Sequence, residues 1–514
     1  MDKHQVRPLI HRVVGKAGPN PRRISPLELL LPNGFAKRSV VFGSNLPKRL
    51  LPECYTTNVE PADLALLAPT ATECRSSGWL KEAVRVLAGS LEPDGILYAL
   101  APRPFRPTLK RLMRDHGLLT GLHMAHLPNF ASSRYLVPVS PVNMHYTLTN
   151  LLFAGNLKQW LATSTFGFLK SQELISTILP FVGLVARHSD ARPLLDWLFK
   201  LGNESGSAGN AIIRSRLRAE KETAVIFRFP KGSALPDAAA KVSLAGPLVA
   251  KTPHEAAVMT RFGSSARSAG AQVPKVFLDH HIAEHSVVLQ TVLDGRSAAD
   301  LLLSQSKSLP VFMEHISQWL DRWNRATAAV KPLDSARLER ELIAPVKFLD
   351  PYIKEGREYR EWLTTRFKAA LGTVMPFVVV HGDLSMTNVL INKEKKIGII
   401  DWEASACNAL PLSDFFYAAA DAAAAVHGYV ERLQAFQTCF VPGGSYVEPI
   451  RALQLKLRRS LNISADIADF CFHACWLSHA VNESRSEPPH RRRFLEIVQF
   501  VAYHRYETIG WLCS

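Results

Sequence analysis

Cysteines and long apolar runs are both scarce in this sequence of 514 residues. The seven cysteines are irregularly spaced, which argues against a disulfide framework and favours a reducing, cytoplasmic compartment. The most apolar stretch, residues 174–186, is shorter than the roughly 20 residues that a membrane-spanning helix needs. We expect this stretch to form a buried helix that is kinked at Pro180. Because no apolar signal-peptide core follows the first charges either, we predict a protein without a transmembrane segment.

Acidic residues are also in the minority. The sequence holds 61 Lys and Arg against 45 Asp and Glu, a net charge of +16, and residues 1–50 contain ten basic residues against two acidic ones. We expect residues 1–37 to form a basic, partly disordered leader. Such a leader fits contact with polyanions, such as nucleic acid, an anionic membrane or phosphorylated ligands, and it equally fits a solvated tail.

Residues 38–140 alternate in a way that is typical of an α/β domain, and the length of the chain requires further domains. Short apolar runs at 40–42 and 64–68 favour buried strands, and apolar positions at helical spacing predict a helix from Trp79. The segments that follow predict a strand, a helix and a strand at residues 96–101, 107–116 and 134–139.

This α/β segment resembles the C-terminal half of a class I S-adenosylmethionine-dependent methyltransferase, over about 80 residues that include ADLALLAP, LAGSLEPDGILYALAP and LKRLMRDHGLL. The resemblance implies a partial Rossmann-like sheet. The glycine-rich turn that lets the backbone approach a cofactor is missing, and only Phe42-Gly43-Ser44 stands in its place. Two alternatives stay open: a methyltransferase that binds S-adenosylmethionine, and a degenerate sheet that serves packing or partner binding.

Polar side chains follow two β-branched apolar runs in the segment FVVVHGDLSMTNVLINKEKKIGIIDWE, residues 377–403. Asp383 follows the first run, Asn388 comes five residues later, and Asp401 directly follows the second run. Two carboxylates and one amide oxygen are hard ligands that suit Mg²⁺, whose remaining positions are filled by water and substrate phosphates. The spacing therefore predicts metal-assisted phosphoryl transfer.

The motifs HGDLSMTN and IIDWE are similar to those of aminoglycoside phosphotransferases and choline kinases, a branch of the protein-kinase fold. The resemblance implies ATP as the phosphoryl donor, Asp383 as the catalytic base, and Asn388 and Asp401 as Mg²⁺ ligands. It also implies that His381 orients the catalytic loop, and a satisfied buried histidine is the alternative.

Several residues outside the motif have structural interpretations. We expect Trp402 to pack in the core and Asp414 to brace the loop or start a helix. For Cys471, His473 and Cys475 we favour buried thiols over a zinc site, because His473 points away from the other two on a helix and no second ligand pair lies nearby.

The resemblance also requires a small lobe with a lysine, an acidic partner and a hinge. Lys241 lies in a strand-like run and Glu255 follows fourteen residues later in a helical stretch, so we predict an ion pair that holds Lys241 toward the ATP phosphates. An exposed surface lysine is the alternative. The resemblance places the hinge, whose backbone meets the adenine, at Gln290 to Val292.

The loop that covers the phosphates is ambiguous. The segment GNESGSAGN, residues 202–210, offers Gly206 and Gly209 as a phosphate cradle. A turn at residues 218–222 is an equally open choice, because a further strand separates the glycines from Lys241.

These observations predict an α/β plus α+β protein, with an N-terminal partial Rossmann-like sheet and a bilobal protein-kinase-like domain whose C-terminal lobe is helical. The predicted layout is a basic leader (1–37), a degenerate methyltransferase-like domain (38–140), a helical connector (141–200), a small lobe (201–292) and a large lobe (293–514). The predicted activity is ATP- and Mg²⁺-dependent phosphorylation of a hydroxyl on a small molecule. A non-catalytic pseudokinase, a polyanion-binding protein and a methyltransferase are the alternatives. The acceptor itself is not predicted, and the acidic candidates for binding it are Asp421, Glu448, Asp466 and Asp469.

Overall fold

The fold is described from a computed structural model, which covers residues 25–43, 50, 61–100, 102–127, 133–152, 175, 179, 182–201, 210–216, 223–244, 251–282, 285–486 and 492–506. The chain divides into two compact units, and each is considered by itself. The first comprises residues 1–256 and 275–292, and the second comprises residues 257–274 and 293–514. The predicted boundary between residues 292 and 293 coincides with one of these divisions, and the domain assignment as a whole stays a prediction.

The first unit is built on one eleven-stranded sheet, in the order β1-β2-β3-β6-β4-β5-β7-β8-β9-β12-β11. Only the pairs β1–β2 and β2–β3 are parallel, and every later pair is antiparallel. The strands are β1 (Ser39–Phe42), β2 (Ala62–Leu67), β3 (Leu91–Leu100), β4 (Leu118–Leu127), β5 (Tyr135–Pro138), β6 (Val182–His188), β7 (Asn210–Arg216), β8 (Thr223–Phe229), β9 (Ala238–Ser243), β11 (Val276–Ile282) and β12 (His285–Thr291). Parallel α/β pairing, which a Rossmann-like sheet requires, is thus limited to three strands.

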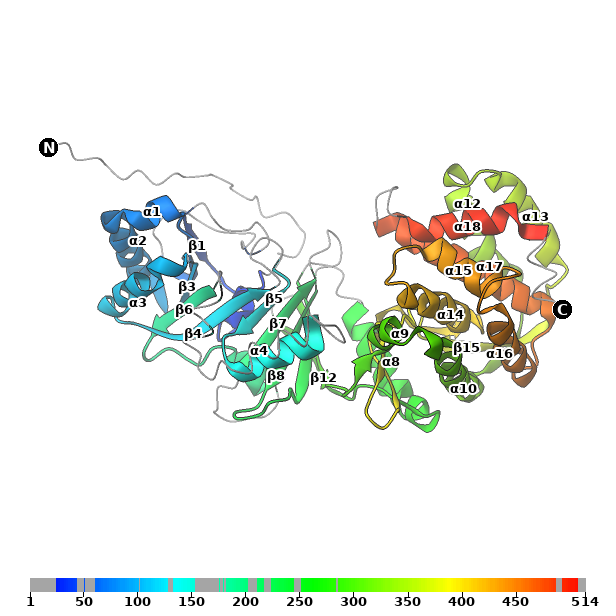
Figure 1. The fold of residues 1–514 in the computed structure, drawn as a ribbon, viewed down its shortest axis with the longest axis horizontal. Coiled ribbons are helices and arrows are strands. Elements are labelled where there is room, and N and C mark those ends of the chain that lie inside the picture. The colour runs from blue at the N-terminus through cyan, green and yellow to red at the C-terminus, as the bar shows by residue number, and fades with distance from the viewer. Residues whose placement is uncertain are drawn as a thin grey trace. The chain divides into compact units, whose positions relative to one another are not determined.

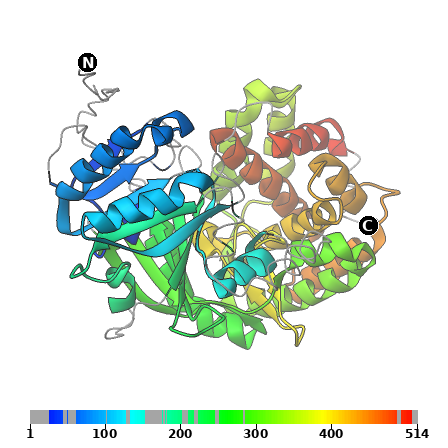
Figure 2. The ribbon, with the colours of Figure 1, turned by 60° about the vertical axis from the view of Figure 1, so that its left-hand side comes forward.

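Helices α1 (Ala71–Arg75), α2 (Ser77–Gly89) and α3 (Arg106–Asp115) belong to this parallel part, and Figure 2 shows them beside the strands. The apolar residues Leu80, Val84 and Leu87 recur at helical spacing in α2 and pack with strand residues on one face of the sheet. The other face carries a second cluster that includes Leu29 and Leu198. Helices α4 (Pro141–Tyr146) and α7 (Asp196–Lys200) and the N-terminal part of α8 (Lys251–Ser268) also belong to this unit.

The structure corrects two predictions for this unit. Residues 182–188, expected within a helical connector, form strand β6, which is buried between β3 and β4. A short apolar run is ambiguous between a buried helix and a buried strand, and here the strands on both sides supply its hydrogen bonds. Of the predicted leader, residues 1–24 lie outside the described residues, whereas Leu27 and residues 29–31 are buried in the core.

The predicted α/β domain and the predicted small lobe share this sheet. Tyr135 and Leu136 of β5 pair with Arg214 and Ile213 of β7, and the Ser215 amide donates to the Arg134 carbonyl at 2.8 Å. The backbone hydrogen bonds of the two regions therefore form one continuous ladder.

The second unit is mainly helical, as predicted for the large lobe (Figure 1). It contains the C-terminal part of α8 (Lys251–Ser268) and the helices α9 (Ala298–Ser304), α10 (Leu309–Thr327), α11 (Ser335–Leu338), α12 (Ala344–Leu349), α13 (Gly356–Lys368), α14 (Ser413–Val426), α15 (Arg432–Phe440), α16 (Val447–Ser460), α17 (Ala465–Ser486) and α18 (Arg493–Tyr503). Rings of Phe416, Phe436, Phe440, Phe472 and Trp476 pack edge to face or tilted at the centre of this bundle. Within the described ranges, no helix is both long and apolar enough to cross a membrane.

Two small sheets accompany these helices. One has the order β10-β17-β16-β13 and the other the order β14-β15-β18. Their strands are β10 (Ala271–Gln272), β13 (Arg296–Ser297), β14 (Ala329–Pro332), β15 (Val374–Val380), β16 (Val389–Ile391), β17 (Ile397–Ile399) and β18 (Ala406–Ala409). The HGD motif follows β15 and the IIDWE motif begins at the last residue of β17, so these sheets position the predicted site.

Candidate active site

A β-hairpin brings the predicted metal ligands to the same place in the second unit. Strands β16 and β17 pair antiparallel, with Val389 opposite Ile399. The ladder continues one step further, because the Ile400 amide donates to the Asn388 carbonyl at 3.0 Å. Asp401 directly follows Ile400 and Asn388 directly precedes β16, so both residues lie at the open end of this hairpin. The twelve residues between them form the two strands, their turn and Ile400.

The loop between β15 and β16 begins with a turn that only glycine fits. Gly382 has a φ of +78°, and a Cβ atom there would lie 2.2 Å from the Ala404 carbonyl oxygen. The buried Asp414 carboxylate accepts the amide hydrogens of His381 at 2.7 Å and Gly382 at 2.9 Å. The prediction that Asp414 braces the loop is therefore confirmed.

His381 is fully buried, and both of its ring nitrogens bond to backbone. Its Nδ1 accepts the Asp383 amide hydrogen at 3.3 Å, and its Nε2 donates to the Ile400 carbonyl at 3.0 Å. The imidazole thus connects the Asp383 loop to the end of β17, which matches the orienting role.

Asn388 contacts Asp383 directly. Its side-chain amide nitrogen donates to the Asp383 carbonyl at 3.0 Å and to Asp383 Oδ2 at 3.3 Å. Since the amide nitrogen is used in this way, the amide oxygen is the atom through which Asn388 would hold a metal. Burial raises the pKa of Asp383, and the Asp401 and Asp421 carboxylates raise it further, against the lowering effect of His381 and of a hydrogen bond from Tyr417. Asp383 and Asp401 therefore lie within electrostatic range of each other.

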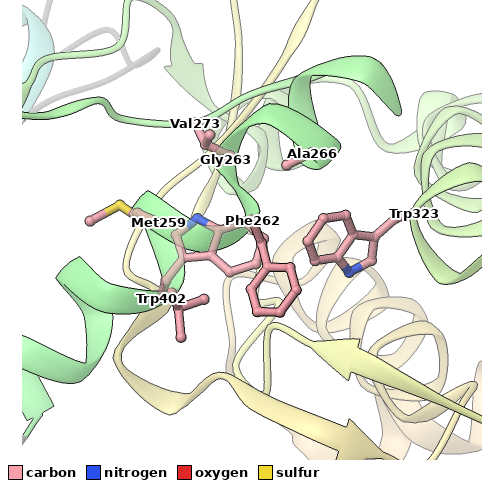
Figure 3. Close-up of a pocket in the computed structure, with 8 residues that line it drawn as sticks. Met259, Phe262, Gly263, Ala266, Val273, Trp323 and Trp402 are labelled. Carbon is pink, nitrogen blue, oxygen red and sulfur yellow. The ribbon is translucent and has the colours of Figure 1, made fainter. Parts of the chain in front are cut away.

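Trp402 holds the backbone beside Asp401. Asp401 adopts a left-handed conformation with a φ of +68°, which Asp tolerates better than most residues. The indole nitrogen of Trp402 donates to the Ile399 carbonyl at 3.2 Å, and the indole packs against Trp323 with a centroid distance of 5.7 Å. Figure 3 shows that residues of α8, among them Met259 and Phe262, line the apolar space around these rings. The prediction of core packing for Trp402 is confirmed.

The predicted ion pair between Lys241 and Glu255 is present in the first unit. Lys241 Nζ lies 2.7 Å from Glu255 Oε2, and the two residues are 8% and 1% exposed. Lys241 lies on β9, opposite Val225 of β8 and Val288 of β12. The alternative of an exposed surface lysine is therefore wrong, and the contact with ATP phosphates stays a prediction.

The predicted hinge lies at the end of β12, and most of the predicted glycine loop lies outside the described residues. Gln290 lies on β12 opposite Ala239, and its side-chain oxygen is buried without a hydrogen-bond partner among the described residues. Val292 directly follows the end of β12. Gly206 and Gly209 lie outside the described residues, as does the alternative turn at 218–222.

Four further residues surround the Asp383 loop in ways that the sequence pattern did not predict. Tyr417 of α14 is buried near Asp383 and lowers the pKa of its carboxyl group. The Asp421 carboxylate accepts the Met386 amide hydrogen of the loop at 2.7 Å and is held by the Tyr429 hydroxyl and by Arg432, each at 3.0 Å. One sequence pattern could have indicated these contacts. Asp414, Tyr417 and Asp421 are spaced by three and four residues, which gives the otherwise apolar helix α14 one polar face. Asp421 is fully buried in these contacts, so it is not exposed for an acceptor.

The other acidic candidates for the acceptor differ in exposure. Glu448 and Asp466 are exposed, and Asp466 pairs with Arg366 at 2.6 Å. Asp469 is fully buried near Arg366 at 3.8 Å and His473 at 3.6 Å, and burial raises its pKa to about 7.

The segment with Cys471, His473 and Cys475 lies in the buried helix α17. Burial raises the pKa of both thiols, and His473 Nδ1 instead bonds to the Tyr359 hydroxyl at 2.7 Å. Buried thiols are confirmed here. No group of three or more His, Cys, Asp and Glu residues is arranged for a metal within the part of the chain that the structure describes. The predicted magnesium ligands are two carboxylates and the amide of Asn388, so they do not form a group of that kind.

Residues 227–444 match the model of the phosphotransferase enzyme family. The predicted resemblance of the C-terminal region to that family is confirmed. The matched range includes Lys241, Glu255, Asp383, Asn388 and Asp401. No curated protein gives a significant match, and the methyltransferase resemblance stays a prediction.

Matches among solved structures include an aminoglycoside phosphotransferase from Streptomyces rimosus, at 15% identity and a TM-score of 0.35, covering 55% of this chain and 97% of that chain. An aminoglycoside phosphotransferase in complex with GDP and kanamycin matches at 12% identity and a TM-score of 0.38, covering 60% and 97%. A fructosamine-3-kinase homologue from Haemophilus somnus matches at 8% identity and a TM-score of 0.36, covering 59% and 94%.

Proposed function

We propose that this protein is a kinase that transfers the terminal phosphoryl group of ATP to a hydroxyl group of a small molecule. The single observation that carries the proposal is the hairpin that places Asn388 beside Asp401, with Asp383 hydrogen-bonded to Asn388. Phosphoryl transfer needs a positioned hydroxyl and neutralised phosphate charge more than covalent work by the protein. The match of residues 227–444 to the phosphotransferase family supports the same conclusion.

Each residue has a definite task in this mechanism. Asp383 orients the acceptor hydroxyl and takes its proton, and its raised pKa suits a base that must hold that proton briefly. Asn388 and Asp401 would hold Mg²⁺ through an amide oxygen and a carboxylate. When bound, the metal neutralises the phosphate charge that develops during transfer. His381 keeps the loop in register with β17 by its two backbone hydrogen bonds.

The nucleotide would be bound mainly by residues of the first unit. Lys241 contacts the phosphates and Glu255 fixes the lysine through their 2.7 Å ion pair. The backbone from Gln290 to Val292 meets the adenine. Gly206 and Gly209 would cover the phosphates through backbone amides. The acceptor is a hydroxylated small molecule.

Replacing one metal ligand tests the proposal. We expect Asp401→Asn to lower Mg²⁺-dependent ATP turnover by at least about a hundredfold, because a neutral amide no longer offsets the metal charge. Transfer of labelled phosphate from ATP is measured with water alone and with a panel of acceptors that contains an aminoglycoside, a sugar and an amino alcohol. Unfolding curves check that the variant stays folded.

The matched control is Asp334→Asn, which removes an exposed carboxylate that caps α11 through the Arg337 amide at 2.7 Å. Asn caps helices as well as Asp does, so this variant should keep both stability and turnover. Full activity of Asp401→Asn would defeat the proposal. Mg²⁺-dependent ATP binding by the unmodified protein without any turnover would favour the pseudokinase alternative instead.

A further inference from the structure

Asp421 on helix α14 is a fully buried carboxylate to which the proposed mechanism gives no task. It lies in a stretch of the helix, Asp414 to Ala425, in which every residue is buried and most are apolar. Burial of a carboxylate costs free energy unless hydrogen bonds and an opposite charge compensate it. The groups that bond to Asp421 therefore indicate what this residue does.

Three groups from separate segments donate to this carboxylate. One oxygen, Oδ2, accepts the Met386 amide hydrogen at 2.7 Å and the Tyr429 hydroxyl hydrogen at 3.0 Å. The other oxygen, Oδ1, pairs with Arg432 Nη1 at 3.0 Å. The Arg432 guanidinium also lies over the rings of Tyr429 and Phe494, at 5.4 and 4.8 Å from their centroids. Asp421 is thus fixed by α15 and the turn before it, and its remaining hydrogen bond reaches the loop that carries Asp383.

Met386 lies near the middle of that loop. It follows Asp383 by three residues and precedes Asn388 by two. Its backbone is held from two sides, because Asp421 accepts its amide hydrogen and its carbonyl accepts the Ala299 amide hydrogen at 3.0 Å. Ala299 belongs to α9, so two helices fix the backbone of this one residue. Met386 is also fully buried.

Two tight turns connect Met386 to the residues of the predicted site. The Ser385 amide donates to the Asp383 carbonyl at 2.8 Å, and the Asn388 amide donates to the Ser385 carbonyl at 2.9 Å. Met386 lies inside the second of these turns. The Asn388 side chain also donates to the Asp383 carboxylate at 3.3 Å, so a shift of the Met386 backbone would displace both side chains.

We propose that Asp421 is a positioning residue for phosphoryl transfer, because it anchors the Met386 backbone and thereby fixes the relative position of Asp383 and Asn388. The inference rests on the proposed function, which assigns Asp383 as the base and Asn388 as a metal ligand. Displacement of a reacting group by about 1 Å can cost about a hundredfold in rate. Loss of the anchor should therefore slow transfer and weaken the binding of Mg²⁺.

The test compares two double variants that differ in whether residue 421 can accept the Met386 amide hydrogen. Both carry Arg432→Met, so neither leaves an isolated buried charge. In the Asn variant, Asp421→Asn with Arg432→Met, the amide oxygen can replace Oδ2 as the acceptor. In the Leu variant, Asp421→Leu with Arg432→Met, the side chain keeps its branched shape and offers no acceptor.

We expect the Leu variant to have a kcat about tenfold or more below that of the Asn variant. The Mg²⁺ concentration at half-maximal turnover should rise about tenfold, because the predicted ligand Asn388 loses its support. The KM for ATP should change less than about twofold, since the residues predicted to bind ATP lie in the first unit. A purely structural role would lower kcat through the amount of folded protein and would leave the Mg²⁺ midpoint unchanged.

Hydrogen exchange of the Met386 amide gives a readout that does not depend on turnover. This amide should exchange about tenfold faster in the Leu variant than in the Asn variant. The matched control is Tyr359→Phe, which removes another buried hydrogen bond of the second unit, between the Tyr359 hydroxyl and His473 Nδ1 at 2.7 Å. This control should change neither the exchange of the Met386 amide nor the Mg²⁺ midpoint.

Several outcomes would overturn the inference. Equal kcat values and Mg²⁺ midpoints in the two double variants would do so, and so would equal exchange of the Met386 amide. If transfer is lost in Asp401→Asn and kept in the Leu variant, the inference fails alone and the proposed function stands. If the unmodified protein transfers no phosphate, the proposed function fails and the inference fails with it.

Discussion

Breaking the buried ion pair between Lys241 and Glu255 should destabilise the protein strongly. The two side chains are 10% and 1% exposed and their charged atoms lie 2.7 Å apart. Lys241→Met keeps an unbranched side chain that is one atom shorter and removes the charge, which leaves the Glu255 carboxylate buried without this partner. Breaking one partner of a buried pair typically costs about 3–5 kcal/mol. We therefore expect urea unfolding of the variant to lose about that much free energy in the transition of the first unit.

Replacing both charges separates stability from catalysis. The double variant Lys241→Met with Glu255→Gln leaves no isolated charge, and replacing a buried pair by neutral residues of similar volume is often neutral within a few kcal/mol. Unfolding free energy should therefore recover in the double variant relative to Lys241→Met. ATP turnover should not recover, because the lysine that would contact the phosphates is still absent.

Two results would refute this reasoning. A loss below about 1 kcal/mol in Lys241→Met would mean that the pair behaves like a surface ion pair. Restored turnover in the double variant would mean that Lys241 has no role beyond neutralising Glu255. The single variant Glu255→Gln completes the cycle and gives the coupling energy of the two side chains.

Two further predictions concern the loop and helix α17. Gly382→Ala should lose about 1–2 kcal/mol of unfolding free energy from the left-handed backbone alone, and more because its Cβ meets the Ala404 carbonyl. Turnover should fall as well. A variant with unchanged stability and turnover would contradict this geometry. Asp469 has a pKa of about 7 in the fold against an ordinary value of 3.8, so the folded state binds the extra proton in this window and stability is lost as pH rises through it. Asp469→Asn should therefore gain up to about 4 kcal/mol over the unmodified protein at pH 8 and nothing at pH 4, and equal unfolding curves at pH 8 would contradict the assignment.

The chemistry-bearing residues could be predicted from sequence because they are close together along the chain. Asp383, Asn388 and Asp401 lie within nineteen residues, and short strands between them leave few ways to arrange the segment. The Lys241–Glu255 pair was also predictable, because the strand that carries Lys241 is soon followed by the helix that carries Glu255. In both cases local chain geometry decides most of the contact.

Other contacts depend on packing between distant segments. Residues 182–188 were expected in a helix because a short apolar run suits either structure, and only β3 and β4 on its two sides make it a strand. Tyr417 was not predicted because an aromatic residue in an apolar helix is typical of a core. Its place near Asp383 depends on tertiary packing, because that residue lies 34 positions earlier in the sequence.

The sequence by itself determined the kinds of side chain at the site, their order and the short strands that carry them, since these follow from local spacing and hydrogen-bonding pattern. Only the tertiary structure decided that one sheet joins the α/β region to the strand of Lys241, and that carboxylates of α14 hydrogen-bond to the Asp383 loop. Such contacts join segments far apart in the chain, and they form where burial and unpaired backbone groups can be satisfied together.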